Sequence, residues 1–242
     1  MKFIDTNSLQ TRKAGSFTFS AVRPEKLGAA EYTLVTLVVD KTGSVAGFET
    51  ELLKMKRVVV EACQKNARAE FLLLRSVEFN HSVDEVHGFV ELAKIDPAQY
   101  REPHCTGSTA LYDASYSAIA ATNEFARALS EKDFGVNGVV ILVTDGGEND
   151  SSQSLNDVKR EMGRGVSSEW LESLNVILVG VNAAAARREL EAFARDAALT
   201  QYVDAGQATP QKLARLAEFV SRSISSQSQA LGTGGASQPL RF

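Results

Sequence analysis

Two aliphatic runs, each ending in an acidic residue, constrain the fold of this 242-residue chain more than any other feature. The first is Tyr32 to Asp40, with the sequence YTLVTLVVD, and the second is Gly138 to Asp145, with GVVILVTD. Continuous apolar, β-branched runs of this length are typical of strands that are buried on both faces, as in parallel sheets covered by helices. We therefore expect both runs to be strands of one α/β sheet, with Tyr32 to Asp40 at its centre.

Strand and helix patterns alternate along the rest of the chain. Further strands are expected at Phe71 to Phe79, Val83 to Val90, Leu174 to Val181 and Gln201 to Asp204, the second of these being polar enough to lie at the sheet edge. Helices are expected at Glu51 to Ala69, Leu111 to Leu129, Ser154 to Met162 (closed by Gly163 and Gly165), Ala184 to Ala197 and Pro210 to Ile224. This alternation predicts an α/β fold with a doubly wound, mainly parallel sheet flanked by helices on both faces, a Rossmann-like arrangement.

Composition divides the chain into three parts. Residues 31–224 carry the alternating pattern and are expected to form one domain. Residues 1–30 are polar and form an N-terminal extension, in which Phe17 to Ser20 offers an extra edge strand. Residues 225–242 are rich in Ser, Gly and Gln, and we expect a flexible tail there.

The charge balance and the hydropathy exclude several functional classes. Lys and Arg number 26 and Asp and Glu 30, so the net charge of −4 gives no reason to expect nucleic-acid binding. The longest aliphatic run, Val139 to Val143, is too short to cross a membrane, and the start of the chain lacks an apolar stretch of signal-peptide length. We expect a cytoplasmic protein that does not bind membranes and is a monomer when alone.

Sulfur and imidazole ligands are scarce. The chain has two cysteines and three histidines, Cys63, Cys105, His81, His87 and His104, and their spacing does not match a zinc site. Any metal ion would therefore have to be bound by oxygen atoms.

Oxygen-bearing side chains follow the two acid-ended strands. Asp40 is followed at alternate positions by the hydroxyls of Thr42 and Ser44, Asp145 begins the turn Asp-Gly-Gly, and Thr109 lies just before the helix that starts at Leu111. The carboxyl ends of parallel strands meet at one edge of a sheet, where ligands bind. Two carboxylates with neutral hydroxyls suit Mg²⁺, or Mn²⁺ or Ca²⁺, because such hard cations prefer oxygen ligands.

Three separated motifs carry a family resemblance. Asp40-x-Thr42-x-Ser44, then Thr109 within Gly-Ser-Thr-Ala-Leu-Tyr-Asp, then Thr144-Asp145-Gly146 together resemble the metal-ion-dependent adhesion site (MIDAS) of von Willebrand factor type A (VWA) domains. The resemblance covers residues 31–224 and implies a doubly wound sheet. It also implies that Asp40, Thr42, Ser44, Thr109 and Asp145 hold the ion, with Thr42 standing where the family usually has Ser.

The same resemblance implies a binding role. Family members bind proteins through an acidic residue of the partner, and the compact chain resembles stand-alone bacterial VWA proteins of the tellurite-resistance type or those found beside AAA+ ATPases. We therefore expect a partner that presents Glu or Asp, such as an AAA+ ATPase, a kinase or a phosphatase, within a bacterial stress-resistance or ATPase-associated system.

An enzymatic alternative rests on the same residues. Asp40-Lys41-Thr42-Gly43-Ser44 also resembles the phosphorylation motif of P-type ATPases, whose HAD fold is a parallel α/β sheet; Asp40 would then be the nucleophile of a Mg²⁺-dependent phosphotransferase or phosphatase, and Asp145 would hold the ion. Against it, Thr42 stands where HAD phosphatases keep an Asp as general acid, and Asp145 is not preceded by Gly. We expect a binding module without catalytic activity.

Overall fold

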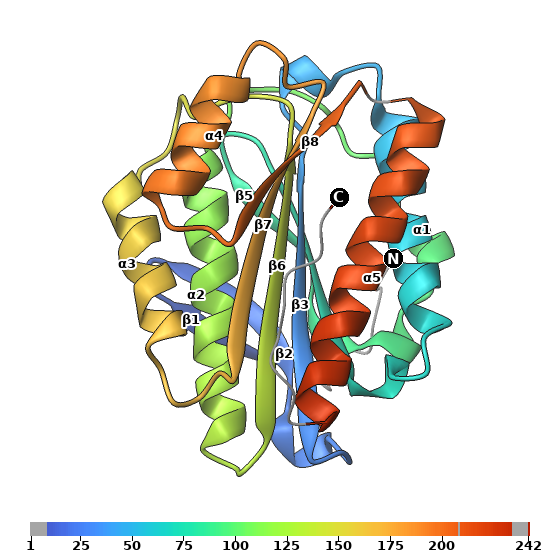
Figure 1. Ribbon diagram of the computed structural model, residues 1–242, viewed down its shortest axis with the longest axis vertical. Coiled ribbons are helices and arrows are strands. Elements are labelled where there is room, and N and C mark those ends of the chain that lie inside the picture. The colour runs from blue at the N-terminus through green and yellow to red at the C-terminus, as the bar shows by residue number, and fades with distance from the viewer. Residues whose placement is uncertain (1–8, 208, 234–241) are drawn as a thin grey trace.

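The computed structural model describes residues 9–207, 209–233 and 242, and its strands form one sheet (Figure 1). The sheet order is β1-β2-β5-β4-β3-β6-β7-β8. Its strands are β1 (Leu9–Ala14), β2 (Phe17–Val22), β3 (Glu31–Asp40), β4 (Leu72–Phe79), β5 (Val83–Glu91), β6 (Gly135–Thr144), β7 (Ser173–Val181) and β8 (Gln201–Gly206). The helices are α1 (Glu49–Gln64), α2 (Leu111–Ser130), α3 (Leu155–Val166), α4 (Arg187–Asp196) and α5 (Pro210–Thr233).

The predicted fold class is confirmed, because most strand pairs are parallel and helices cover both faces. β3 pairs in parallel with β4 on one side and with β6 on the other, and β7 and β8 extend the parallel part. Only β1–β2 and β4–β5 are antiparallel among the described strands. β3 and β6 are the two aliphatic runs, and both lie in the middle of the sheet.

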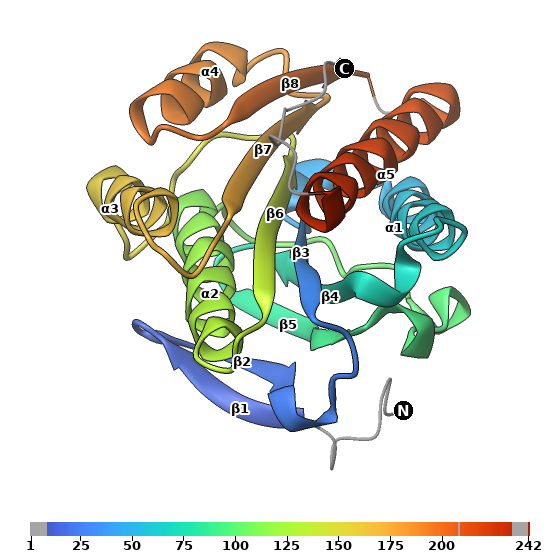
Figure 2. The same ribbon diagram turned by 60° about the horizontal axis from the view of Figure 1, so that its bottom comes forward.

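Two helical layers enclose the sheet (Figures 1 and 2). Helices α2, α3 and α4 lie on one face, and α1 and α5 lie side by side on the other. Successive residues of β3 serve the two cores in turn: Leu34 and Val38 pack toward α2, whereas Val35, Leu37 and Val39 pack toward α1 and α5. Burial on both faces explains why this strand reads as a continuous apolar run.

The N-terminal extension is a hairpin that joins the sheet, and this corrects the predicted place of the strand at Val83 to Val90. β2 pairs in parallel with that strand, β5, through Ala21 and Phe89, so β5 lies inside the sheet and β1 forms the edge. The approach is close at Gly88, where a Cβ atom would lie 1.9 Å from the Ser20 carbonyl oxygen. Residues 1–8 of the predicted extension lie outside the described part of the chain.

Helix boundaries also differ from the prediction. The helix expected to close at Gly163 and Gly165 continues through both to Val166. Gly165 serves packing and not termination, because a Cβ atom there would lie 2.5 Å from Asn123 Oδ1 of α2. The helix expected from Glu51 to Ala69 ends at Gln64.

The predicted flexible tail from residue 225 is wrong over its first nine residues. α5 continues to Thr233, and its polar residues find partners: Asn66 Nδ2 donates to Ser225 Oγ at 2.6 Å, and Asn137 Nδ2 donates to the Gln227 carbonyl at 2.9 Å. Gln227 and Ser228 are buried. The rest of the predicted tail, residues 234–241, lies outside the described residues.

Candidate metal centre

The five predicted site residues lie on three loops at the carboxyl edge of the sheet. Asp40 is the last residue of β3, Asp145 follows the last residue of β6, and Thr109 lies two residues before α2. β3 and β6 are neighbours, and chain connections leave them in opposite directions, so the crevice between them is the switch point of the doubly wound sheet. Ligands bind at such points because the loops on either side separate there.

Asp40 is held rigidly. Its Oδ1 accepts a hydrogen bond from Thr42 N at 2.7 Å, and its Oδ2 accepts one from Thr144 Oγ1 at 2.6 Å. The residue is buried, at 1% exposure. Thr144 thus orients the Asp40 carboxylate from the adjacent strand.

Hydroxyl groups link the two carboxylates. Thr42 Oγ1 lies 3.0 Å from Ser44 Oγ, and Ser44 Oγ donates to Asp145 Oδ1 at 2.8 Å. Four of the five predicted residues therefore form one hydrogen-bonded chain that crosses from the β3 loop to the β6 loop.

Thr109 reaches the same place from the third loop. A Cβ atom on Gly146 would lie 3.7 Å from Thr109 Oγ1, so the Thr109 hydroxyl adjoins the turn that follows Asp145. Gly43 N donates to the Gly107 carbonyl at 3.1 Å, which ties the Thr109 loop to the β3 loop as well. Thr109 is buried, at 4% exposure.

The electrostatics of the centre disfavour two bare carboxylates. Burial raises the pKa of the Asp40 carboxyl above its usual value, the hydrogen bonds from Thr144 and Thr42 oppose this, and the nearby charge of Asp145 adds to it. Burial also raises the pKa of Asp145, against the hydrogen bond from Ser44. A bound cation would compensate both charges.

The donor set fits a hard divalent ion. Within the described residues, no group of three or more His, Cys, Asp or Glu side chains is placed to hold a metal. A site at this edge therefore depends on the hydroxyls of Thr42, Ser44 and Thr109 beside the two carboxylates. All five donors are oxygen atoms, the ligand type that Mg²⁺, Mn²⁺ and Ca²⁺ share.

Some residues that shape the centre had no predicted role. Thr144 is part of the Thr-Asp-Gly motif, but its hydrogen bond to Asp40 depends on the pairing of β3 with β6. Asn149 Oδ1 accepts a hydrogen bond from Thr109 N at 2.8 Å, and Glu148 Oε2 accepts one from Tyr112 N at 2.8 Å. The only feature of the sequence that could have indicated a role for Glu148 and Asn149 is their position directly after Asp145-Gly-Gly.

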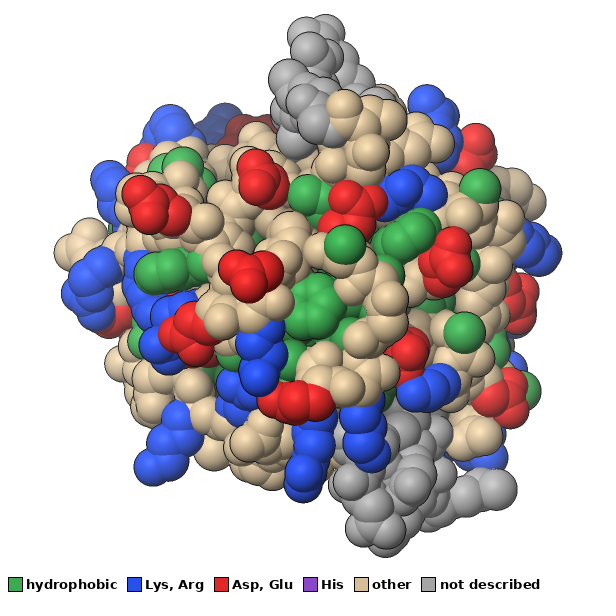
Figure 3. Space-filling model, turned by 90° about the horizontal axis from the view of Figure 1, so that it is seen from below, with side chains coloured by type: hydrophobic (Ala, Val, Ile, Leu, Met, Phe, Trp, Pro, Cys, Tyr) green, Lys and Arg blue, Asp and Glu red, His purple; other side chains and the backbone are tan. Residues whose placement is uncertain are grey.

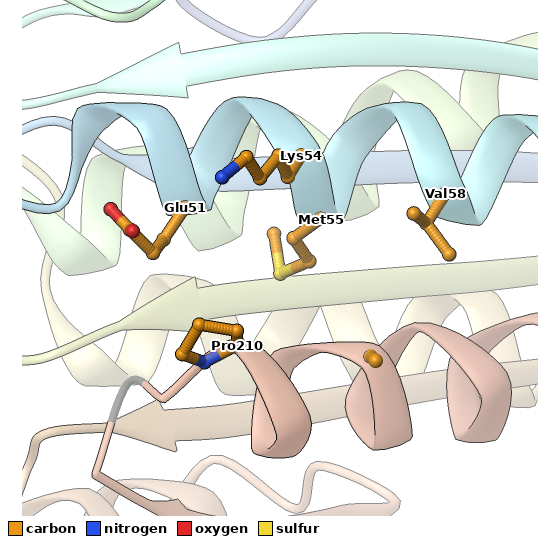
Figure 4. Close-up of a pocket in the computed structure, with 6 residues that line it drawn as sticks. Glu51, Lys54, Met55, Val58 and Pro210 are labelled. Atoms are coloured by element: carbon orange, nitrogen blue, oxygen red, sulfur yellow. The ribbon is translucent and has the colours of Figure 1, made fainter.

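Two other surfaces lie away from this centre. A groove of about 200 Å³ between α1 and the start of α5 is lined by Glu51, Lys54, Met55, Val58, Pro210 and Ala214, and none of the five site residues lines it (Figure 4). Figure 3 shows the opposite end of the molecule, where acidic and basic side chains are interspersed around a small apolar area. No helix in the described part of the chain has the length and apolar character needed to cross a membrane.

Comparison with known proteins gives similarity of structure only. No protein-family model matches the chain, and no curated protein matches it by sequence. Among solved structures, the PilB minor pilin from Streptococcus sanguinis is 14% identical over 89% of this chain and 66% of the pilin, with a TM-score of 0.57. The SpaC pilus adhesin from Lactobacillus rhamnosus GG is 12% identical over 93% of this chain and 35% of the adhesin, with a TM-score of 0.58.

A third neighbour is a protein with a MIDAS motif of its own. Proximal thread matrix protein 1 from the mussel byssus, in a structure with a zinc-occupied MIDAS motif, is 17% identical over 82% of this chain and 47% of that protein, with a TM-score of 0.53. The chain has a VWA-type fold. It spans less than two thirds of each of the three proteins, and at these identities the likeness concerns the fold alone.

Proposed function

We propose that this chain is a divalent-metal-dependent protein-interaction module whose MIDAS-like centre binds an acidic side chain of a partner. The observation that carries the proposal is the convergence of two carboxylates and three hydroxyls from three loops at the switch point of a VWA-type fold. Asp40, Thr42, Ser44, Thr109 and Asp145 would hold the ion. When bound, the ion supplies positive charge and an exchangeable coordination position that a carboxylate of the partner can occupy.

Position 42 supports binding over the enzymatic alternative. The hydrogen bonds of Asp40 leave lone pairs on both of its oxygens and are compatible with a ligand or a nucleophile. The residue two positions after Asp40 is Thr42, however, where HAD phosphatases keep an Asp as general acid, so the chain lacks that carboxyl group at this position. The preference for Mg²⁺, the cytoplasmic location and the partner's identity as an AAA+ ATPase, kinase or phosphatase remain predictions.

Metal binding is tested by titrating Mg²⁺ and Mn²⁺ into the protein by calorimetry. We expect saturable binding of one ion, and we expect Asp145→Ala to abolish it while leaving the circular dichroism spectrum unchanged. Glu172→Gln serves as the matched control, because Glu172 lies directly before β7, at the amino ends of the parallel strands and away from the centre. This variant should bind the metal ion as the unaltered protein does. Equal affinity in the Asp145→Ala variant would refute the proposed site.

The exchangeable position is tested with Mn²⁺ bound to the protein. A water molecule on protein-bound Mn²⁺ accelerates the relaxation of bulk water protons, and acetate that replaces this water should reduce the acceleration. Acetamide, which has the same size without the charge, is the control. If acetate and acetamide act alike, the centre does not select carboxylates and the partner-binding part of the proposal is wrong.

A further inference from the structure

The loop that follows β6 caps helix α2 from outside that helix. The N-cap residue of α2 is Ala110, whose side chain cannot accept a hydrogen bond from the free amides of the first turn. Side chains of the 145–153 loop take its place: Tyr112 N donates to Glu148 Oε2 at 2.8 Å and Asp113 N to Ser151 Oγ at 3.0 Å. Just before the N-cap, Thr109 N donates to Asn149 Oδ1 at 2.8 Å.

The capping is reciprocal. The carboxylate of Asp113, in the first turn of α2, accepts hydrogen bonds from Ser152 N at 3.1 Å and from Gln153 N at 2.7 Å. Asn149 N donates in turn to the Thr109 carbonyl at 3.0 Å. We call the side chains of Asp113, Glu148, Asn149 and Ser151 the brace.

Glu148 is the centre of the brace. Its Oε1 accepts from Asp150 N and from Ser151 N, both at 2.7 Å, and its Oε2 accepts from Ser151 Oγ at 2.6 Å besides Tyr112 N. An ionised carboxylate has about four acceptor sites, so this set of donors occupies it. The backbone also anchors to α4, because Glu148 N donates to Glu189 Oε1 at 2.9 Å.

The brace joins two of the three loops that carry the proposed ligands. Thr109 lies at one end of it and Asp145 precedes its other end, yet none of its side-chain bonds goes to a ligand oxygen. Its effect on the centre is therefore through position: it sets where the Thr109 hydroxyl stands relative to the Asp145 carboxylate.

We propose that the brace makes the centre selective for Mg²⁺ over Ca²⁺, an inference that rests on the proposed metal site. Mg²⁺ requires nearly ideal octahedral geometry with ligands at about 2.0–2.1 Å, whereas Ca²⁺ accepts a variable number of ligands at about 2.3–2.6 Å in flexible geometry. Two loops that are joined by these hydrogen bonds hold the ligands at fixed positions, as the strict geometry of Mg²⁺ requires. Loops that can separate adapt more readily to the larger ion.

The variant Glu148→Gln tests this, because it keeps the shape of the side chain but replaces an acceptor oxygen by a donor group. We expect it to lower the Mg²⁺ affinity about tenfold or more, the usual effect of losing a residue that positions a ligand. The Ca²⁺ affinity should fall several-fold less, so the ratio of the two affinities, measured by calorimetry, should move toward Ca²⁺. Loss of the Glu148 charge alone would weaken both ions alike and leave the ratio unchanged.

A matched control is available in the next helix. Asp157 caps α3 by accepting hydrogen bonds from Ser154 N at 2.8 Å and Ser154 Oγ at 2.6 Å, and α3 carries no proposed ligand. Asp157→Asn removes a helix cap of the same chemistry, and the Mg²⁺ to Ca²⁺ ratio should not change. If Glu148→Gln does not fold, Asn149→Ala removes a single bond of the brace and should move the ratio in the same direction.

Hydrogen exchange of the metal-free protein supplies a second readout. Protection of the Tyr112 and Ser151 amides, which both donate to Glu148, should fall in Glu148→Gln and stay unchanged in Asp157→Asn. An unaltered affinity ratio with normal Mg²⁺ binding, or unaltered protection of these amides, would overturn the role of the brace and leave the metal site intact. Failure of the unaltered protein to bind either ion would overturn the metal site, and the selectivity proposal with it.

Discussion

His87 of β5 should make the protein progressively less stable below neutral pH. Its imidazole is buried, with Nδ1 lying 2.9 Å from the Gly88 carbonyl oxygen and Nε2 lying 2.7 Å from the Tyr100 hydroxyl. This arrangement suits a neutral ring that donates from Nδ1 and accepts at Nε2. The pKa of His87 is lowered from 6.5 to about 4, mainly by burial; the positive charges of Lys56 and Arg75 act in the same direction, whereas the hydrogen bond with the Gly88 carbonyl and the charge of Glu85 oppose it.

The direction and size of the effect follow from this pKa. Below pH 6.5 the unfolded chain takes up a proton at His87, but the folded protein does not until about pH 4. The contribution of His87 is therefore fully present above pH 6.5 and is lost as the pH falls toward 4. One pKa unit corresponds to about 1.4 kcal/mol, so the loss over this window amounts to about 3 kcal/mol.

Urea denaturation at pH 7 and at pH 4.5, for the unaltered protein and for His87→Gln, measures this loss. Other groups titrate over the same range in both proteins, so the difference between the two losses isolates His87. We expect the unaltered protein to lose about 2–3 kcal/mol more free energy of unfolding than the variant does. Equal losses in the two proteins would refute the argument.

Two further substitutions test the packing of the sheet. Gly88→Ala should destabilise the protein by about 1–3 kcal/mol in urea denaturation, because the new Cβ atom would lie 1.9 Å from the Ser20 carbonyl oxygen and would push β2 away from β5; a loss below 0.5 kcal/mol would contradict this contact. Lys56→Ala should cost about 3–5 kcal/mol, because the Lys56 ammonium, buried on α1, lies 2.5 Å from Glu78 Oε1 and its removal leaves that carboxylate unpaired. Lys56→Ala with Glu78→Gln should recover part of the loss, and a double variant no more stable than Lys56→Ala would contradict the pairing.

The centre of the fold could be predicted from the sequence because its signals are local. β3 and β6 are buried on both faces along nearly their whole length, so most of their positions are apolar, and an acid stands at the end of each run, Asp40 as the last residue of β3 and Asp145 directly after β6. The capping box of α3 was also visible, since Ser154 and Asp157 stand at the required spacing. The loops that carry Asp40, Thr109 and Asp145 meet because their elements meet.

The remaining features depend on contacts between distant segments. Composition predicts a linker from residue 225, but Asn66 and Asn137 supply hydrogen-bond partners that let a Ser- and Gln-rich helix pack on the sheet. In the sequence, Glu148 looks like an ordinary acidic residue of a polar turn. Its role is visible only in the structure, where the Tyr112 amide of α2 donates to it. Neither partner is near in sequence, so no local pattern indicates either contact.

The pairing of β2 with β5 also has a consequence for the order of folding. Apart from the pairing of its own two strands, the β1–β2 hairpin contacts β5 and α2, which come later in the chain, and an isolated two-stranded hairpin is marginally stable in water. β2 of the hairpin pairs with β5 through Ala21 and Phe89. In the sequence, β3, α1 and β4 lie between these two strands. During synthesis Phe19 and Ala21 therefore stay uncovered until β5 has been made and has paired with β4, and Phe19 stays partly uncovered until Phe125 of α2 follows. A nascent chain that stalls between β2 and β5 would expose an apolar strand edge, the state in which chains of this kind aggregate.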